Sequence, residues 1–170
     1  MTSTTPAEIP APDRTARDEV GRLVAACWGA QPDHDAGRAS RWLVAIDGSE
    51  GSLRAAAMAA RLIAAPAGAK VDLVHVHPWL VKEAAEVELA RRGWHASAAA
   101  RAHMDKAGIA WRLHVRMGDA AEAIVALAQE LGSQGIAIGS HGLTATESLF
   151  LGSVAHKVVH LGKVPVLIVR

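Results

Sequence analysis

The sequence predicts an α/β fold, an open five-stranded parallel sheet with helices on both faces. Five short apolar segments alternate with stretches of helical periodicity, and this alternation is typical of a parallel sheet. The composition is 51% hydrophobic and only 4% aromatic, and its many alanines favour helices that pack closely on a sheet. The 170 residues fit one domain, because a chain of this length buries roughly 70% of the surface of its unfolded form.

The predicted strands are Trp42–Ile46, Val71–Val76, Trp111–Met117, Ile136–Ile138 and Val164–Val169. Apolar residues at helical spacing predict helices around 53–63 and 124–131, and Asp119 followed by Glu122 resembles a capping box. Residues 82–106 are also expected to be helical, although Gly93 weakens their middle. The third strand alternates apolar with charged residues and the fifth contains Pro165, so both are expected at the edges of the sheet. This favours the strand order 3-2-1-4-5, whose reversal lies between strands one and four, where open α/β sheets bind ligands.

Residues 1–39 are interpreted as an N-terminal extension and residues 40–170 as the folded domain. The first thirteen residues lack a hydrophobic period and predict a flexible tail. Val20, Leu23, Val24 and Cys27 recur at helical spacing and predict one short helix. Gly, Pro and Asp between 29 and 40 place the domain boundary near Ser40. Cys27 is interpreted as a small buried residue and not as a reactive thiol, because no activating histidine is expected beside it.

The charge balance does not indicate a polymeric partner. Eighteen Lys and Arg against seventeen Asp and Glu leave a net charge of +1, so neither nucleic acid nor a membrane surface is expected as a partner. No apolar run reaches the roughly 18 residues that cross a bilayer. The single cysteine cannot form an internal disulfide, and residues 1–20 lack the pattern of a secretory signal, so a cytoplasmic location is expected.

The segment after the fourth strand has the pattern of a phosphate-binding loop. It reads Gly139-Ser140-His141-Gly142, then nine residues, then Gly152-Ser153, where a helix is expected to begin with Val154, Val158 and Leu161 on one face. Glycines let backbone amides approach an anion, and the start of a helix presents free N–H groups and the positive end of its dipole. The alternative is a tight turn followed by a helix start. The preceding strand and the position at the strand-order reversal favour phosphate binding.

The same residues are similar to a known family signature. Gly139-x-x-Gly142-x9-Gly152-Ser153 resembles the ATP-binding motif of universal stress proteins. Segments 44–49, 73–76 and 164–169 resemble the first, second and last strands of that family, so the likeness covers residues 40–170. The resemblance implies the adenine nucleotide alpha hydrolase-like fold and a stress-response regulatory or signalling module that binds ATP.

The resemblance also implies roles for individual residues. Asp47 is expected near the ribose or adenine, and the main chain of Val76 at the adenine. Around the ribose and phosphates it places Gly139, Gly142, Gly152 and Ser153, with Gly48, Ser49, Ser140 and Val154 as further lining residues. Many relatives carry arginines in the loop 143–151, but this chain has none there, so ADP or AMP stays possible as the ligand and Mg²⁺ is a candidate to offset the charge.

Two alternatives remain beside nucleotide binding for regulation. One is a dimeric adapter of the same fold that binds no nucleotide, and the other is a slow ATP hydrolase. The motifs G-x-x-x-x-G-K-[ST] and G-x-S-x-G are missing from the sequence, so no catalytic residues are assigned and at most weak ATPase activity is expected. The pairs His75 with His77 and His156 with His160 lack a third ligand, so no metal site is predicted.

The apolar last strand predicts a homodimer that pairs through it, and a protein partner is possible.

Overall fold

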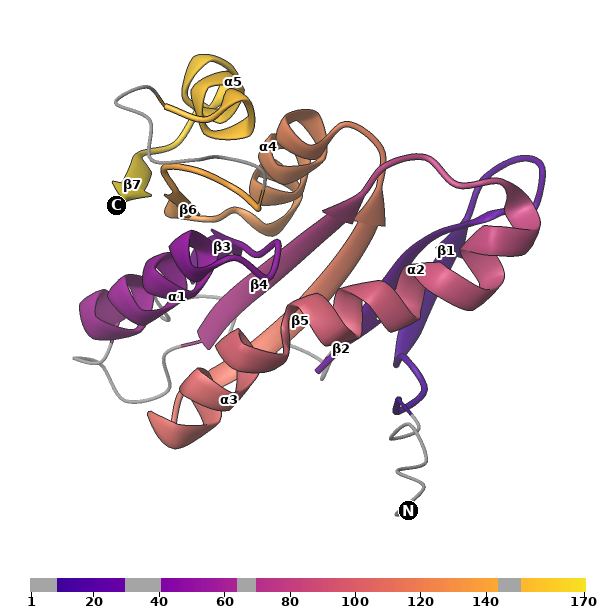
Figure 1. The fold of residues 1–170 in the computed structure, drawn as a ribbon, viewed down its shortest axis with the longest axis horizontal. Coiled ribbons are helices and arrows are strands. Elements are labelled where there is room, and N and C mark those ends of the chain that lie inside the picture. The colour runs from indigo at the N-terminus through magenta and orange to yellow at the C-terminus, as the bar shows by residue number, and fades with distance from the viewer. Residues whose placement is uncertain (1–8, 30–40, 64–69, 144–150) are drawn as a thin grey trace.

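The computed structural model describes residues 9–29, 41–63, 70–143 and 151–170. Within these ranges, seven strands form one sheet that has helices on both faces (Figure 1). The strands are β1 (Arg14–Arg17), β2 (Leu23–Trp28), β3 (Arg41–Ala45), β4 (Lys70–His77), β5 (Ala110–Met117), β6 (Gly135–Gly139) and β7 (Val166–Val169). The helices are α1 (Glu50–Ile63), α2 (Lys82–Ala96), α3 (Ala98–Lys106), α4 (Ala120–Leu131) and α5 (Ser153–Leu161).

The strand order is β1-β2-β5-β4-β3-β6-β7. The strands from β3 to β7 are parallel to their neighbours among themselves, and their arrangement confirms the predicted order 3-2-1-4-5. The prediction of a five-stranded, wholly parallel sheet is wrong, because β1 and β2 add an antiparallel hairpin to β5. The sheet is therefore mixed, and its order reverses between β3 and β6, as the sequence predicted.

The short helix predicted before residue 28 is replaced by strands. Ala26 and Trp28 are buried on the same side of β2, at the two-residue period of a strand, whereas Val20 lies 68% exposed in the turn of the hairpin. The apolar spacing fits a helix, but the backbone donors and acceptors along β5 offer a partner that a local pattern cannot reveal. Residues 1–8 of the expected tail and the boundary near Ser40 fall outside the described residues, so the domain division stays a prediction.

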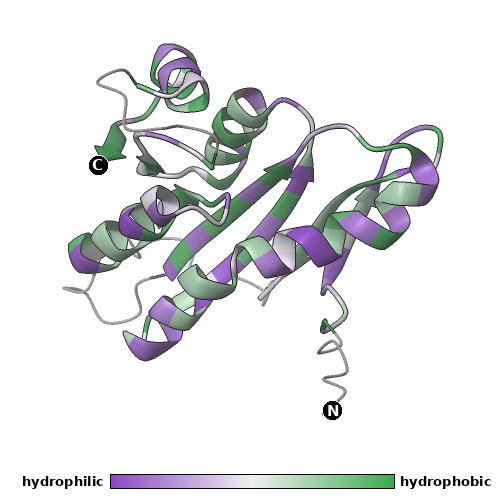
Figure 2. Ribbon diagram, in the orientation of Figure 1, coloured by the Kyte–Doolittle hydropathy of each residue, from purple (hydrophilic) through white to green (hydrophobic). Residues whose placement is uncertain are grey.

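The expectation that the third predicted strand lies at an edge is also wrong. This strand, β5, lies between β4 and β2. Leu113, Val115 and Met117 are buried on the face that α2 and α3 cover, while Arg112, His114 and Arg116 alternate with them on the other face. Figure 2 shows the resulting bands of hydrophobic and hydrophilic colour along the strand. The alternation reports a polar face of the sheet, which is a different property from an unpaired edge.

Two apolar layers enclose the sheet. Helices α1, α2 and α3 contribute buried alanines, Leu89 and Met104 to one layer, and α4 and α5 contribute Ile124, Leu127 and Val158 to the other. Gly93 in α2 faces Val115, and a Cβ atom at position 93 would lie 2.2 Å from Val115 Cγ2. The glycine that weakens the middle of this helix therefore allows its close approach to β5. Among the described helices, none is long and apolar enough to span a bilayer.

Candidate functional site

A cavity of about 400 Å³ lies at the carboxyl ends of β3, β4 and β6, at the point where the strand order reverses. Crevices at this point are the usual ligand sites of open α/β sheets. One wall is apolar, because alternate residues of the strands point to the same face and meet a residue of α4. It consists of Ala45, Ile46, Val74, Val76, Ile124 and Ile138.

A second wall of the cavity is polar and begins with Asp47, which follows β3. Ser49 holds this carboxylate by two hydrogen bonds to Oδ1, from its backbone N at 2.9 Å and from its Oγ at 2.5 Å. The other oxygen, Oδ2, faces Gly142, where a Cβ atom would lie only 2.8 Å away. A glycine at position 142 thus lets the loop after β6 pass close to the carboxylate.

The beginning of α5 closes the polar wall. Gly152 occupies the N-cap position without a side-chain cap, and its N–H donates to the carbonyl of Ser140 over 2.8 Å. The next three residues, Ser153, Val154 and Ala155, line the cavity. Their N–H groups have no acceptor within the helix, and no acidic residue lies in this first turn. The helix start therefore offers backbone donors and the positive dipole end to an anion.

Helix α4, which lines the cavity with Ala120 and Ile124, is joined to α5 by charged side chains. Asp119 caps this helix by accepting from the backbone N of Glu122 at 3.0 Å, which confirms the predicted cap. Lys157 of α5 bonds to Glu122 at 2.9 Å and to Asp119 at 3.1 Å, and these two carboxylates raise the pKa of the lysine. In this arrangement the lysine joins α5 to α4, and its charge is paired with two carboxylates.

The structure brings most of the predicted site residues together. Asp47, Val76, Gly139, Ser140, Gly142, Gly152, Ser153 and Val154 all line the cavity. Gly48 and Ser49 are not among the lining residues. Gly48 has a positive φ of 87° and packs beside Ala96, so its role is to shape the turn. Ser49 acts through Asp47 and accepts from the N–H of Leu53 at the start of α1.

Sequence reasoning missed most of the apolar wall and His141, whose Nδ1 lies 3.0 Å from Ser140 Oγ. Val74 could have been found, because it lies two residues before Val76 and shares its face of the strand. His75 points to the opposite face, where its Nδ1 lies 2.9 Å from the carbonyl of Ile46 and burial lowers its pKa. Within the described ranges, no group of three or more His, Cys, Asp or Glu residues could hold a metal ion.

Comparison with known proteins places this arrangement in a family. The model of the universal stress protein family matches residues 39–170. Universal stress protein YxiE of Bacillus subtilis is 30% identical over 147 residues, which cover 77% of this chain and 99% of that protein. A universal stress protein solved in complex with cAMP is 28% identical, with a TM-score of 0.57 over 79% of this chain and 98% of that one. A universal stress protein of Archaeoglobus fulgidus, solved in complex with dAMP, has the same fold at 24% identity, with a TM-score of 0.60 over 78% of this chain and 98% of that one. This chain belongs to the universal stress protein family.

Proposed function

We propose that this chain binds an adenine nucleotide in the cavity at the ends of β3, β4 and β6, and that the bound state serves a regulatory role. The observation that carries the proposal is the division of one cavity into an apolar wall and an anion-binding wall. A nucleotide has the same division, with a flat apolar base at one end and phosphates at the other. The complexes of similar proteins with cAMP and dAMP support this choice of ligand.

The base lies against Val74, Val76 and Ile124 in this proposal, with main-chain groups of Val76 at its edge. Asp47 Oδ2 accepts from a ribose hydroxyl, since Oδ1 already holds Ser49. The phosphates meet the N–H groups at the start of α5, beside Gly142 and Gly152. Mg²⁺ would lower the negative charge of a triphosphate, because Lys and Arg are missing among the described lining residues.

We expect any ATP hydrolysis at this site to be slow. Efficient hydrolysis needs a general base that can reach a water beside the phosphate. Asp47 is held by Ser49 through Oδ1, and His141 Nδ1 lies beside Ser140 Oγ, so each of these two candidate bases already has a hydrogen-bond partner. Binding by itself is enough for regulation, because ligand at about 100 times its Kd stabilises the bound state by about 2.7 kcal/mol.

The Asp47→Asn variant tests the site by calorimetric titration with AMP and with ATP plus Mg²⁺. Asparagine can still accept from Ser49 through Oδ1, but its second group is a donor and cannot accept from the ribose. We expect affinity to fall about tenfold to a hundredfold, in line with the loss of a hydrogen bond to a charged group. Asp105→Asn is the matched control, since Asp105 binds Trp111 at a distant surface and its loss should leave affinity unchanged.

The titration also separates the proposal from the adapter alternative. If neither nucleotide binds the unmodified chain at millimolar concentration, a dimeric adapter that uses the same fold without a ligand becomes the better description. Equal loss of affinity in both variants would mean that charge, and not the position of Asp47, governs binding.

We also propose that two copies pair through β7. In the order of the described strands β7 is terminal, and it pairs with β6 on one side only. Ile168 on this strand is 37% exposed, and a second copy would cover the open edge. Light scattering at micromolar concentration should give twice the 17.8 kDa of one chain. A single-chain mass would contradict the pairing, and an Ile168→Lys variant should shift a dimer towards that mass.

A further inference from the structure

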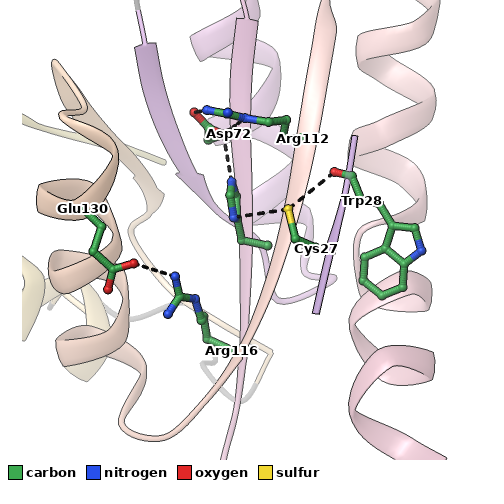
Figure 3. Close-up of polar contacts among 7 residues, drawn as sticks. Cys27, Trp28, Asp72, Arg112, Arg116 and Glu130 are labelled. Carbon is green, nitrogen blue, oxygen red and sulfur yellow. Dashed lines mark hydrogen bonds and ion pairs between the residues drawn. The ribbon is translucent and has the colours of Figure 1, made fainter. Parts of the chain in front are cut away.

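Outside the nucleotide cavity, three side chains with the chemistry of an activated thiol line up across neighbouring strands (Figure 3). Cys27 of β2 lies opposite His114 of β5 in the antiparallel register, and Asp72 lies on β4, the next strand. Cys27 Sγ lies 3.7 Å from His114 Nδ1, and His114 Nε2 lies 2.9 Å from Asp72 Oδ1. The sequence-based expectation that Cys27 has no histidine beside it is therefore wrong.

Asp72 fixes the orientation of the imidazole ring. This carboxylate is fully buried, and Arg112 binds it through Nε at 2.7 Å and Nη2 at 3.1 Å. An ionised carboxylate can only accept, so His114 donates through Nε2–H and turns Nδ1 towards the sulfur. Burial by itself would lower the pKa of His114, but the hydrogen bonds to Asp72 and Cys27 outweigh it and raise that pKa above 6.5. The ring is therefore well placed to take up a proton.

Cys27 is more exposed than its two partners, which are enclosed. Cys27 is half-buried, while His114 is 8% exposed and Asp72 is 0% exposed. Cys27 Sγ also lies 3.8 Å from the carbonyl of Trp28, so the sulfur has only weak alternatives to the imidazole. An attacking thiolate needs access to solvent and a positively charged neighbourhood, and a buried structural cysteine has neither.

The charged groups on this face of the sheet come from three strands and α4. Arg14 of β1 is in register with Cys27, and Arg116 of β5 follows His114 on the same face, where it bonds to Glu130 of α4 at 2.6 Å. Arg112 is bound to Asp72, and Asp13, whose backbone N donates to the carbonyl of Cys27 at 2.9 Å, adds a third carboxylate to this region. Among these groups, the His114 imidazole is the one that lies within hydrogen-bond distance of the sulfur.

We propose that Cys27 is a peroxide-reactive thiol, with His114 as the base that takes its proton and Asp72 as the residue that positions the imidazole. His114 Nδ1 removes the proton from Sγ, and the thiolate attacks one oxygen of a hydroperoxide. The S–O bond forms as the O–O bond breaks, and the imidazolium returns the proton to the leaving oxygen. With hydrogen peroxide the products are a sulfenic acid and water, so sulfur is oxidised and peroxide is reduced. This chemistry does not depend on nucleotide binding.

The first experiment uses the unmodified full chain, in which Cys27 is the single cysteine, so a dimedone adduct in the intact mass reports on this residue alone, whatever oxygen the four methionines gain. Hydrogen peroxide is added at neutral pH with dimedone as the sulfenic acid trap, once to the native protein and once to the protein unfolded in urea. We expect the native protein to react at least about tenfold faster, because a positioned base accelerates proton removal by about that factor or more. A native rate equal to or below the unfolded rate would overturn the proposal.

The second experiment compares His114→Gln with His160→Gln, a surface histidine on α5 that serves as the matched control. At neutral pH the first variant should lose about tenfold or more of the native rate, and the second should keep it. At about pH 10 thiols ionise without help, so the rate of His114→Gln should approach that of the unmodified chain. Equal loss at every pH would mean lost access to the thiol, and would overturn the role given to His114. If the melting curve shows that His114→Gln does not fold, the first experiment decides alone.

Discussion

Replacing Asp72 by alanine is expected to lower the free energy of unfolding by about 3–5 kcal/mol, the cost of removing one partner from a buried ion pair. The variant leaves the guanidinium of Arg112, which is 14% exposed, and the buried imidazole of His114 without their common carboxylate. Urea denaturation measures the loss. Asp105→Ala is the matched control, because that carboxylate makes its hydrogen bond at an exposed position and should cost about 1 kcal/mol or less.

The stability lost in Asp72→Ala should depend on pH, and the pKa shifts of Asp72 and His114 determine the direction of this dependence. Burial would raise the pKa of Asp72, but hydrogen bonds from His114 and Arg112 outweigh it, and the pKa is lowered from 3.8. The stability that this carboxylate contributes is present above that ordinary value and disappears as pH falls through the lower native pKa. The raised pKa of His114 works the other way, because its contribution is full below 6.5 and is lost as pH rises through the native value.

The destabilisation of Asp72→Ala should therefore be largest between these two ordinary values, at about pH 5–6, and smaller at about pH 8–9. Denaturation curves of the variant and the unmodified chain at both pH values measure the difference. A difference that grows with pH would contradict the pairing of His114 with Asp72. A loss below about 1 kcal/mol at both values would show that the buried carboxylate is no better than an apolar residue there.

The order of the parallel strands was predictable because each strand is a short apolar run between helical stretches, and because Pro165 points to an edge. The position of β5 was not predictable from its alternation. Arg112, His114 and Arg116 show that one face of the strand is polar, but the pattern says nothing about the hydrogen bonds along its edges. Whether a neighbour occupies such an edge is decided by the rest of the chain.

The N-terminal hairpin illustrates the same limit. Leu23, Val24 and Cys27 fit a helical period, but β2 is a strand because it pairs with β1 on one side and with β5 on the other, where Cys27 and His114 are 87 residues apart in the sequence. Sequence reasoning missed the reactive thiol for this reason, since Cys27, His114 and Asp72 come from three different strands. Long-range pairing leaves no local signal in a single sequence.

The candidate site was also predictable only in part. The polar wall was predictable because glycine spacing, a strand end and a helix start are local features around Gly139 and Gly152. The apolar wall was largely missed, because Ala45, Val74 and Ile124 look like ordinary core residues until β3, β4 and α4 bring them to one cavity. Local chemistry thus identified the phosphate end, and only the fold identifies the surface for the base.

Replacing Trp28 by alanine is expected to cost about 3–5 kcal/mol, the usual loss for a buried aromatic residue. Trp28 is 4% exposed, its ring centroid lies 5.3 Å from that of Trp94 on α2, and its Nε1 donates to the carbonyl of Pro10 at 2.9 Å. Trp94 in turn lies 6.4 Å from Trp111 of β5. The variant opens a cavity in this cluster. Trp79→Ala is the control, because Trp79 is 61% exposed and should cost about 1 kcal/mol or less.

The same variant decides whether residues 1–39 form an extension or part of the folded domain. If the hairpin folds together with the rest of the sheet, Trp28→Ala shifts a single urea transition, and the amides of β2 exchange hydrogen at the global unfolding rate. If the hairpin is an appendage, the main transition stays in place while the β2 amides exchange early. The burial of Leu23, Ala26 and Trp28 within the layer under α2 favours the first result, which would move the domain boundary to the start of β1.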